Sequence, residues 1–81
     1  MVITGEQLRG ARAMARIEQG DLAARAGVSV DTIKRLERIV GPVSANTMTM
    51  DAIRRALEAA GVLFIAENGE GPGVRLRKVT G

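Results

Sequence analysis

The sequence predicts a small, mainly α-helical domain of about four helices that ends in a β-hairpin. Up to Gly61, apolar residues recur every three or four positions, and residues that favour helix ends flank these stretches. After Gly61 the period changes to that of strands. We expect residues 1–61 to form the helical part and residues 62–81 to form the hairpin of the same domain. A chain of 81 residues is long enough for one such domain.

The first helix is predicted to begin just after Thr4. Thr4 and Gln7 have the S/T-x-x-E/Q spacing of a capping box, in which each side chain accepts a hydrogen bond from the other residue's backbone N–H. Leu8, Ala11 and Ala15 then recur at helical spacing. We expect these three residues to form the face of the helix that packs in the core.

The next two helices are predicted to be short and joined by a tight turn. Glu18 is expected to cap a helix that runs to about Ala26, where Gly27 can adopt the left-handed conformation that ends a helix. Ser29 is a good N-cap for the third helix, and Asp31 near its start suits the positive end of the helix dipole. This is the pattern of a helix-turn-helix, whose second helix can enter the DNA major groove.

A loop and a fourth helix are predicted to follow. Residues 38–48 contain glycine, proline, serine and asparagine, which favour a loop. Thr49 is expected to cap the fourth helix and Gly61 to stop it, with Ile53 and Leu57 on its apolar stripe. Core packing is the expected role of the methionines in this region, Met48 and Met50.

The last segment is expected to form a hairpin that makes a homodimer. Residues 62–65 and 74–77 are strand-like, and residues 68–73 are rich in glycine. An isolated two-stranded hairpin is only marginally stable, and its outer edges can pair with another strand. We therefore expect a two-fold dimer through its apolar face, which consists of Val62, Phe64, Val74 and Leu76.

Composition limits the classes of function. The chain has no cysteine and no histidine, so we expect no disulfide, no zinc site, no enzymatic activity and no cofactor. Its single aromatic residue, Phe64, disfavours binding of single-stranded nucleic acid, which uses aromatic stacking. Neither a secretory signal nor a membrane span is expected, which places the protein in the cytoplasm without a membrane partner. No small-molecule ligand is implied.

The stretch QGDLAARAGVSVDTIKRLE, from Gln19 to Glu37, resembles the Cro/CI-like (XRE) family of bacterial and phage regulators. A glutamine opens the second helix, and LA, AGVS, TI and LE follow at the family's offsets. The resemblance covers roughly residues 8–57, and the C-terminal part is similar to a tail found on short regulators of this family. It implies a lambda-repressor-like fold and a homodimer that binds a palindromic operator in double-stranded DNA.

The resemblance also implies roles for particular side chains. Those expected to contact bases are Ser29, Val30, Asp31, Lys34 and Arg35. Gln19 matches a phosphate-contacting residue, and further phosphate candidates are Thr32, Arg38, Asn46 and Thr47. Arg12 and Glu37 match a pair that forms a buried ion bridge. Val30 and Asp31 depart from the Gln, Arg or Lys common in the family: Val30 could meet a thymine methyl group, and Asp31 could accept from cytosine N4 or cap the helix.

Other interpretations use the same residues differently. The scaffold also suits a protein-interaction module, such as an antitoxin or an antiactivator, although Lys34 and Arg35 favour DNA. Arg12 could be a solvated arginine rather than part of a buried pair. The basic residues near the end, Arg75, Arg77 and Lys78, discourage edge-to-edge aggregation or, less favoured, contact phosphate. Of the two directions of regulation, repression is favoured, because so small a domain can block polymerase simply by occupying an operator.

Overall fold

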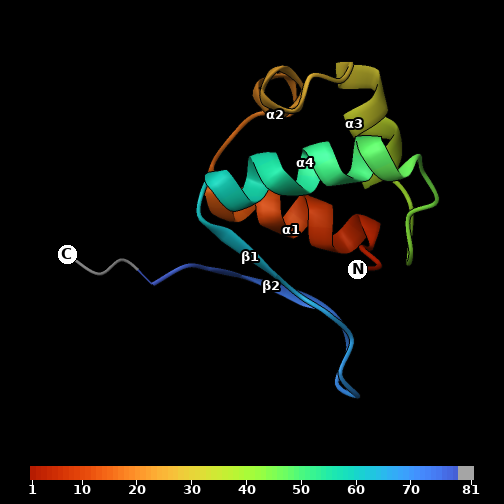
Figure 1. The fold of residues 1–81 in the computed structure, drawn as a ribbon, viewed down its shortest axis with the longest axis vertical. Coiled ribbons are helices and arrows are strands. Elements are labelled where there is room, and N and C mark those ends of the chain that lie inside the picture. Colours follow the sequence, from red (N-terminus) through yellow and green to blue (C-terminus); the bar gives the residue numbers. More distant parts are fainter. Residues whose placement is uncertain (79–81) are drawn as a thin grey trace.

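The computed structural model describes residues 1–78, which form four helices followed by a two-stranded antiparallel hairpin (Figure 1). The helices are α1 (Gly5–Ala15), α2 (Gln19–Ala26), α3 (Val30–Glu37) and α4 (Thr47–Ala59), and the strands are β1 (Val62–Ile65) and β2 (Gly73–Leu76). Helices account for about half of the chain, which confirms a mainly helical fold with a C-terminal hairpin. The end of the predicted hairpin segment, residues 79–81, lies outside the described residues.

The first turn of α1 contains the expected capping box. The Gln7 backbone N–H donates to Thr4 Oγ1 at 3.0 Å, and the Thr4 N–H donates to Gln7 Oε1 at 2.8 Å. In addition, Gln7 Nε2 donates to the carbonyl oxygens of Ile65 and Gly73 at 3.1 and 3.0 Å. A side chain expected only to cap a helix therefore also ties the start of α1 to the end of β1 and the start of β2.

The connection between α2 and α3 is short and capped at both ends. Gly27, with a φ of 71°, ends α2 in the left-handed conformation. Ser29 caps α3, because its Oγ accepts a hydrogen bond from the Thr32 backbone N–H at 3.1 Å. Glu18 occupies the N-cap position of α2 as expected, but its side chain makes no capping hydrogen bond.

The start of α4 differs from the predicted boundary. Its N-cap is Asn46 rather than Thr49, and Asn46 Oδ1 accepts a hydrogen bond from the Met48 backbone N–H at 2.7 Å. Asparagine is among the strongest N-cap residues, so α4 already begins at Thr47. Met48 therefore lies in the exposed first turn, where its side chain is 81 % exposed, and its predicted role in the core is wrong.

A close contact joins the N-terminus of α1 to the loop between α3 and α4. A Cβ atom on Gly5 would lie 1.9 Å from the carbonyl oxygen of Ile39, so only glycine fits there. The Gly5 N–H donates to the Gly41 carbonyl at 3.0 Å, and the Gly41 N–H donates to Glu6 Oε1 at the same distance. This second bond holds the pKa of Glu6 below its ordinary value. Together these bonds fix the loop that leads into α4.

The hairpin contributes to the core of the single chain. Val62 pairs with Leu76 and Phe64 with Val74, so these four side chains share one face of the hairpin. That face packs on α1 and α4: Val62 is fully buried and Phe64 is only 9 % exposed. The expectation that Val62 and Phe64 form an exposed dimer surface is therefore wrong, because the helices already cover them. Val74 is half-buried, and only Leu76, at 55 % exposed, is largely accessible.

Candidate nucleic-acid interface

Helix α3 packs by one side and exposes the other. Its inner side carries the buried Ile33 and Leu36. The residues predicted to contact bases are all exposed, and they are Ser29, Val30, Asp31, Lys34 and Arg35. An α-helix with its side chains is about 10–12 Å across, which fits a major groove about 12 Å wide. The exposed side of α3 can therefore enter the groove without displacing any core residue.

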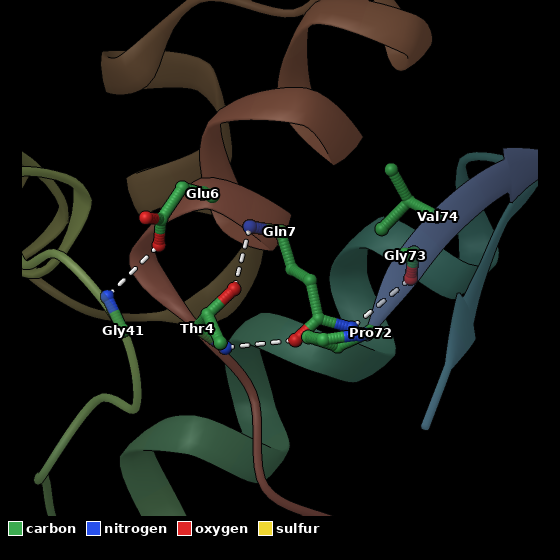
Figure 2. A pocket seen from close by; sticks show the side chains of 7 residues that line it. All are labelled: Thr4, Glu6, Gln7, Gly41, Pro72, Gly73 and Val74. Atoms are coloured by element: carbon green, nitrogen blue, oxygen red, sulfur yellow. Dashed lines mark hydrogen bonds between the residues drawn. The ribbon is translucent and has the colours of Figure 1, made fainter. Parts of the chain in front are cut away.

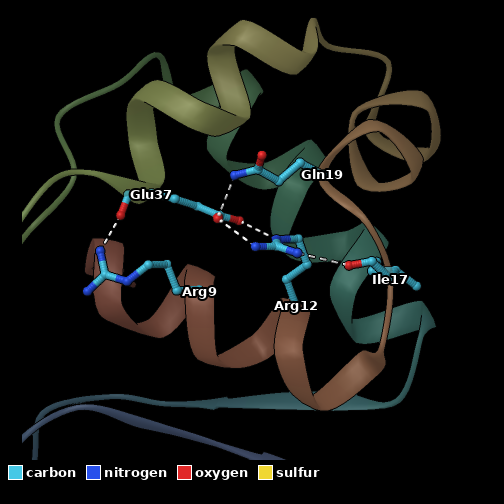
Figure 3. A network of polar contacts seen from close by, with 5 residues as sticks. All are labelled: Arg9, Arg12, Ile17, Gln19 and Glu37. Carbon is cyan, nitrogen blue, oxygen red and sulfur yellow. Dashed lines mark hydrogen bonds and ion pairs between the residues drawn. The ribbon is translucent and has the colours of Figure 1, made fainter.

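A buried carboxylate holds the end of α3 against α1 (Figure 3). Arg12 Nε lies 2.8 Å from Glu37 Oε2, and Arg12 Nη2 donates to Glu37 Oε1 at 3.1 Å, so the expected ion pair is present and two-pronged. Glu37 is 4 % exposed, whereas the Arg12 side chain keeps 24 %. The hydrogen bond from Arg12 to Glu37 raises the pKa of Arg12 above its ordinary value, although burial opposes the shift.

Further donors complete this network (Figure 3). Arg12 Nη1 donates to the carbonyl oxygen of Ile17, in the connection between α1 and α2, at 3.1 Å. Arg9 donates to the backbone carbonyl of Glu37. Because these bonds link α1, the entrance to α2 and the end of α3, they fix the orientation of α3 relative to the rest of the domain.

Gln19 belongs to the same network, which sequence reasoning did not anticipate. Its side-chain Nε2 donates to Glu37 Oε1 at 3.1 Å, and the residue is half-buried at the start of α2. The first backbone N–H groups of a helix have no partner within it, and Glu18 supplies no side-chain cap here. The N-terminus of α2 thus offers backbone donors to an anion, with Gln19 held in place beside them.

The other predicted phosphate contacts lie at different helix ends. Thr32, half-buried, shares a hydrogen bond with Ser29 through its hydroxyl group at 2.9 Å, so this side chain is engaged within the cap of α3. Arg38 is exposed at the C-terminus of α3. Asn46 and Thr47 are exposed at the N-terminus of α4. The capping bond of Asn46 occupies its side-chain oxygen and leaves its amide N–H groups as the donors suited to phosphate.

Comparison with known proteins adds no assignment: no protein-family model and no curated protein matches the chain. None of the helices within residues 1–78 has the length and apolar character needed to cross a membrane. In the same part of the chain, no group of three or more acidic side chains is placed to hold a metal ion. Function is therefore inferred from the residues and the geometry of α2, α3 and α4.

Proposed function

We propose that this protein is a cytoplasmic transcriptional regulator of the lambda-repressor-like type, which binds a palindromic operator in double-stranded DNA as a homodimer. In this proposal α2 and α3 are the helix-turn-helix, and α3 is the recognition helix. The observation that carries the proposal is the division of α3 into two sides. One side is locked into the core by Ile33, Leu36 and Glu37, and the other exposes all five predicted base-contacting residues.

The chemistry of the exposed side suits a duplex. Lys34 and Arg35 are exposed donors on the outer face of α3, and Arg35 can bind guanine O6 and N7 with two hydrogen bonds. The N-termini of α2 and α4 carry backbone N–H groups of the kind that bind phosphate. Occupation of an operator by so small a domain blocks polymerase, so repression remains the favoured direction of regulation.

The test is selection of bound sites from a random duplex library, followed by titration of the selected and random duplexes at several salt concentrations. We expect a palindromic consensus and a linear fall of log K with log salt, because phosphate contacts release counterions. If the protein binds no duplex even at low salt, the DNA proposal fails. The interaction-module alternative, an antitoxin or an antiactivator, would then be favoured.

Replacement of the main candidate base reader should relax specificity. We expect Arg35→Ala to weaken binding to the selected operator by about 1–3 kcal/mol and to lose the preference at one base pair in each half-site. The measurement is a titration of operators substituted at each position. Arg55→Ala, which removes an exposed arginine from α4, is the matched control. Equal weakening of specific and random duplexes by Arg35→Ala would leave Lys34 as the alternative reader.

Replacement of the phosphate candidate at the start of α2 should act differently. We expect Gln19→Ala to weaken binding by a similar factor for all duplexes, because phosphate contacts position the protein without reading sequence. The measurement is the ratio of affinities for selected and random duplexes, which should stay unchanged. Since Gln19 also donates to Glu37, thermal melting of the variant is measured alongside. A new preferred operator sequence would contradict the assignment.

A further inference from the structure

The outer edge of β2 is open to another strand. The Arg77 N–H donates to the Gly61 carbonyl at 2.7 Å, and such bonds alternate along an antiparallel pair. The N–H and C=O groups of Val74 and Leu76 therefore point away from β1. Within residues 1–78 the sheet has only two strands, so nothing in this part of the chain pairs with that edge.

A hollow of about 400 Å³ lies beside this edge (Figure 2). It lies between the first turn of α1, Gly41 and the start of β2, and no residue of β1 lines it. Its residues are Thr4, Glu6, Gln7, Gly41, Pro72, Gly73 and Val74. Leu76 projects from the same face of the hairpin as Val74 and is 55 % exposed. The edge thus combines unpaired backbone groups, an exposed leucine and a hollow.

The charged side chains of β2 restrict the registers in which β2 of a second copy can pair with this edge. Arg75, Arg77 and Lys78 are exposed, and like charges directly opposite one another destabilise a sheet. A two-fold axis at Arg75, Leu76 or Arg77 would place two arginines opposite each other. An axis at Val74 instead places Gly73 of the second copy opposite Arg75. Arg77 then lies beyond the start of β2 of the second copy, where no arginine faces it.

The same register satisfies the other features of the edge. With the axis at Val74, the N–H and C=O groups of the two Val74 residues bond reciprocally. Leu76 lies opposite Pro72 of the second copy, beside the hollow that Pro72 lines. Lys78 then comes close to Glu70, which lies in the turn before β2 of the second copy, and both side chains are exposed in the single chain. The two bonds between the Val74 residues, the apolar fit of Leu76 and the charges therefore agree on one arrangement. Pro72 has no N–H, so at that position only the Leu76 N–H can bond across the edge, to the Pro72 carbonyl.

We propose that β2 pairs antiparallel with β2 of a second copy about a two-fold axis at Val74, with Leu76 of each chain entering the hollow of the other. The inference rests on one part of the proposed function, the homodimeric state, and does not depend on DNA binding. This interface differs from the dimer surface expected from the sequence. Val62 and Phe64 are already buried in the single chain, so the second copy contacts the edge of β2 instead.

The first test is sedimentation equilibrium of the full chain without DNA. We expect a dimer that Leu76→Glu converts to a monomer with an unchanged fold, because Leu76 is exposed in the single chain. Met48→Glu is the matched control, since Met48 is also exposed but lies at the start of α4, and it should remain a dimer. A monomeric parent chain, or a Leu76→Glu variant that dimerises like the parent, overturns the proposal.

These outcomes are separable from failure of DNA binding. A monomer that binds operator half-sites would overturn the dimer but leave the DNA proposal intact. A dimer that binds no duplex would overturn the DNA proposal and leave the dimer proposal intact.

Charge reversal tests the register. Lys78→Glu and Glu70→Lys should each raise the dissociation constant of the dimer about 3- to 30-fold, because each disturbs two symmetric exposed ion pairs. The double variant should recover most of the loss, since it restores opposite charges across the axis. Additive losses in the double variant would show that Lys78 and Glu70 do not meet, and would overturn this register.

A single cysteine tests the position of the axis. The chain contains no cysteine, and opposed residues in a hydrogen-bonded antiparallel pair have Cα atoms about 5.5 Å apart, within disulfide range. Val74→Cys should therefore form a covalent dimer when incubated with oxidised glutathione. Leu63→Cys, on the opposite face of the hairpin, should remain largely uncrosslinked. Equal crosslinking of the two variants would contradict an axis at Val74.

Discussion

Arg12→Ala is expected to lower the free energy of unfolding by about 3–5 kcal/mol, the range for removal of one partner from a buried ion pair. Glu37 is 4 % exposed, and without Arg12 its only remaining side-chain donor among the described residues would be Gln19. The loss should lie near the lower figure, because the Arg12 side chain is 24 % exposed and water can enter the vacated space. Urea denaturation monitored by circular dichroism measures the change.

Two comparison variants test whether the loss comes from breaking a buried ion pair. Arg25→Ala breaks an exposed pair with Asp21 on α2, and we expect it to cost about 0.5 kcal/mol or less. The double variant Arg12→Leu, Glu37→Leu should recover part of the loss, because neither charge is then left buried. If Arg12→Ala and Arg25→Ala had equal effects, Arg12 would be a solvated side chain without a structural role.

The sequence was most informative where structure depends on neighbouring residues. The capping box at Thr4 and Gln7, the cap at Ser29 and the left-handed turn at Gly27 are local arrangements. Each depends on residues at most five positions apart, so the residue types alone predict the geometry. For the same reason the exposed side of α3 followed from the helical spacing of Ile33 and Leu36.

Contacts between distant residues were harder to predict. The side-chain amide of Gln7 also donates to the carbonyl oxygens of Ile65 and Gly73. No local pattern indicates that a capping side chain will bind the hairpin as well. The position of Gly5 against Ile39 likewise depends on how α1 meets the loop before α4. At the candidate interface, the bond from Gln19 to Glu37 needed the packing of α2 against α3.

The hairpin shows the same limit. Alternation in residues 62–65 and 74–77 predicted its strands and which residues share a face. It did not predict whether that face packs on the helices of the same chain or on a second chain. Burial against either partner produces the same alternation of apolar and polar residues. The structure places Val62 and Phe64 against α1 and α4, which assigns the hairpin to the folding unit itself.

Phe64→Ala is therefore expected to destabilise the single chain by about 3–5 kcal/mol, the usual cost of truncating a buried aromatic side chain. Phe64 is 9 % exposed and packs in the same core cluster as residues of all four helices, so its loss leaves a cavity under α1 and α4. Urea denaturation is measured at protein concentrations at which the parent chain is monomeric, so that dissociation does not contribute to the unfolding signal.

Leu76→Ala under the same dilute conditions is the control for Phe64→Ala. Leu76 shares the hairpin face of Phe64 but is 55 % exposed, so we expect its truncation to change the free energy of unfolding by about 0.5 kcal/mol or less. At higher concentrations we expect formation of the proposed dimer to depend more on Leu76 than on Phe64, because only Leu76 contacts the second copy in the proposed arrangement. If Phe64→Ala unfolds like the parent chain, the hairpin does not complete the core, and Phe64 would again be available as a contact between chains.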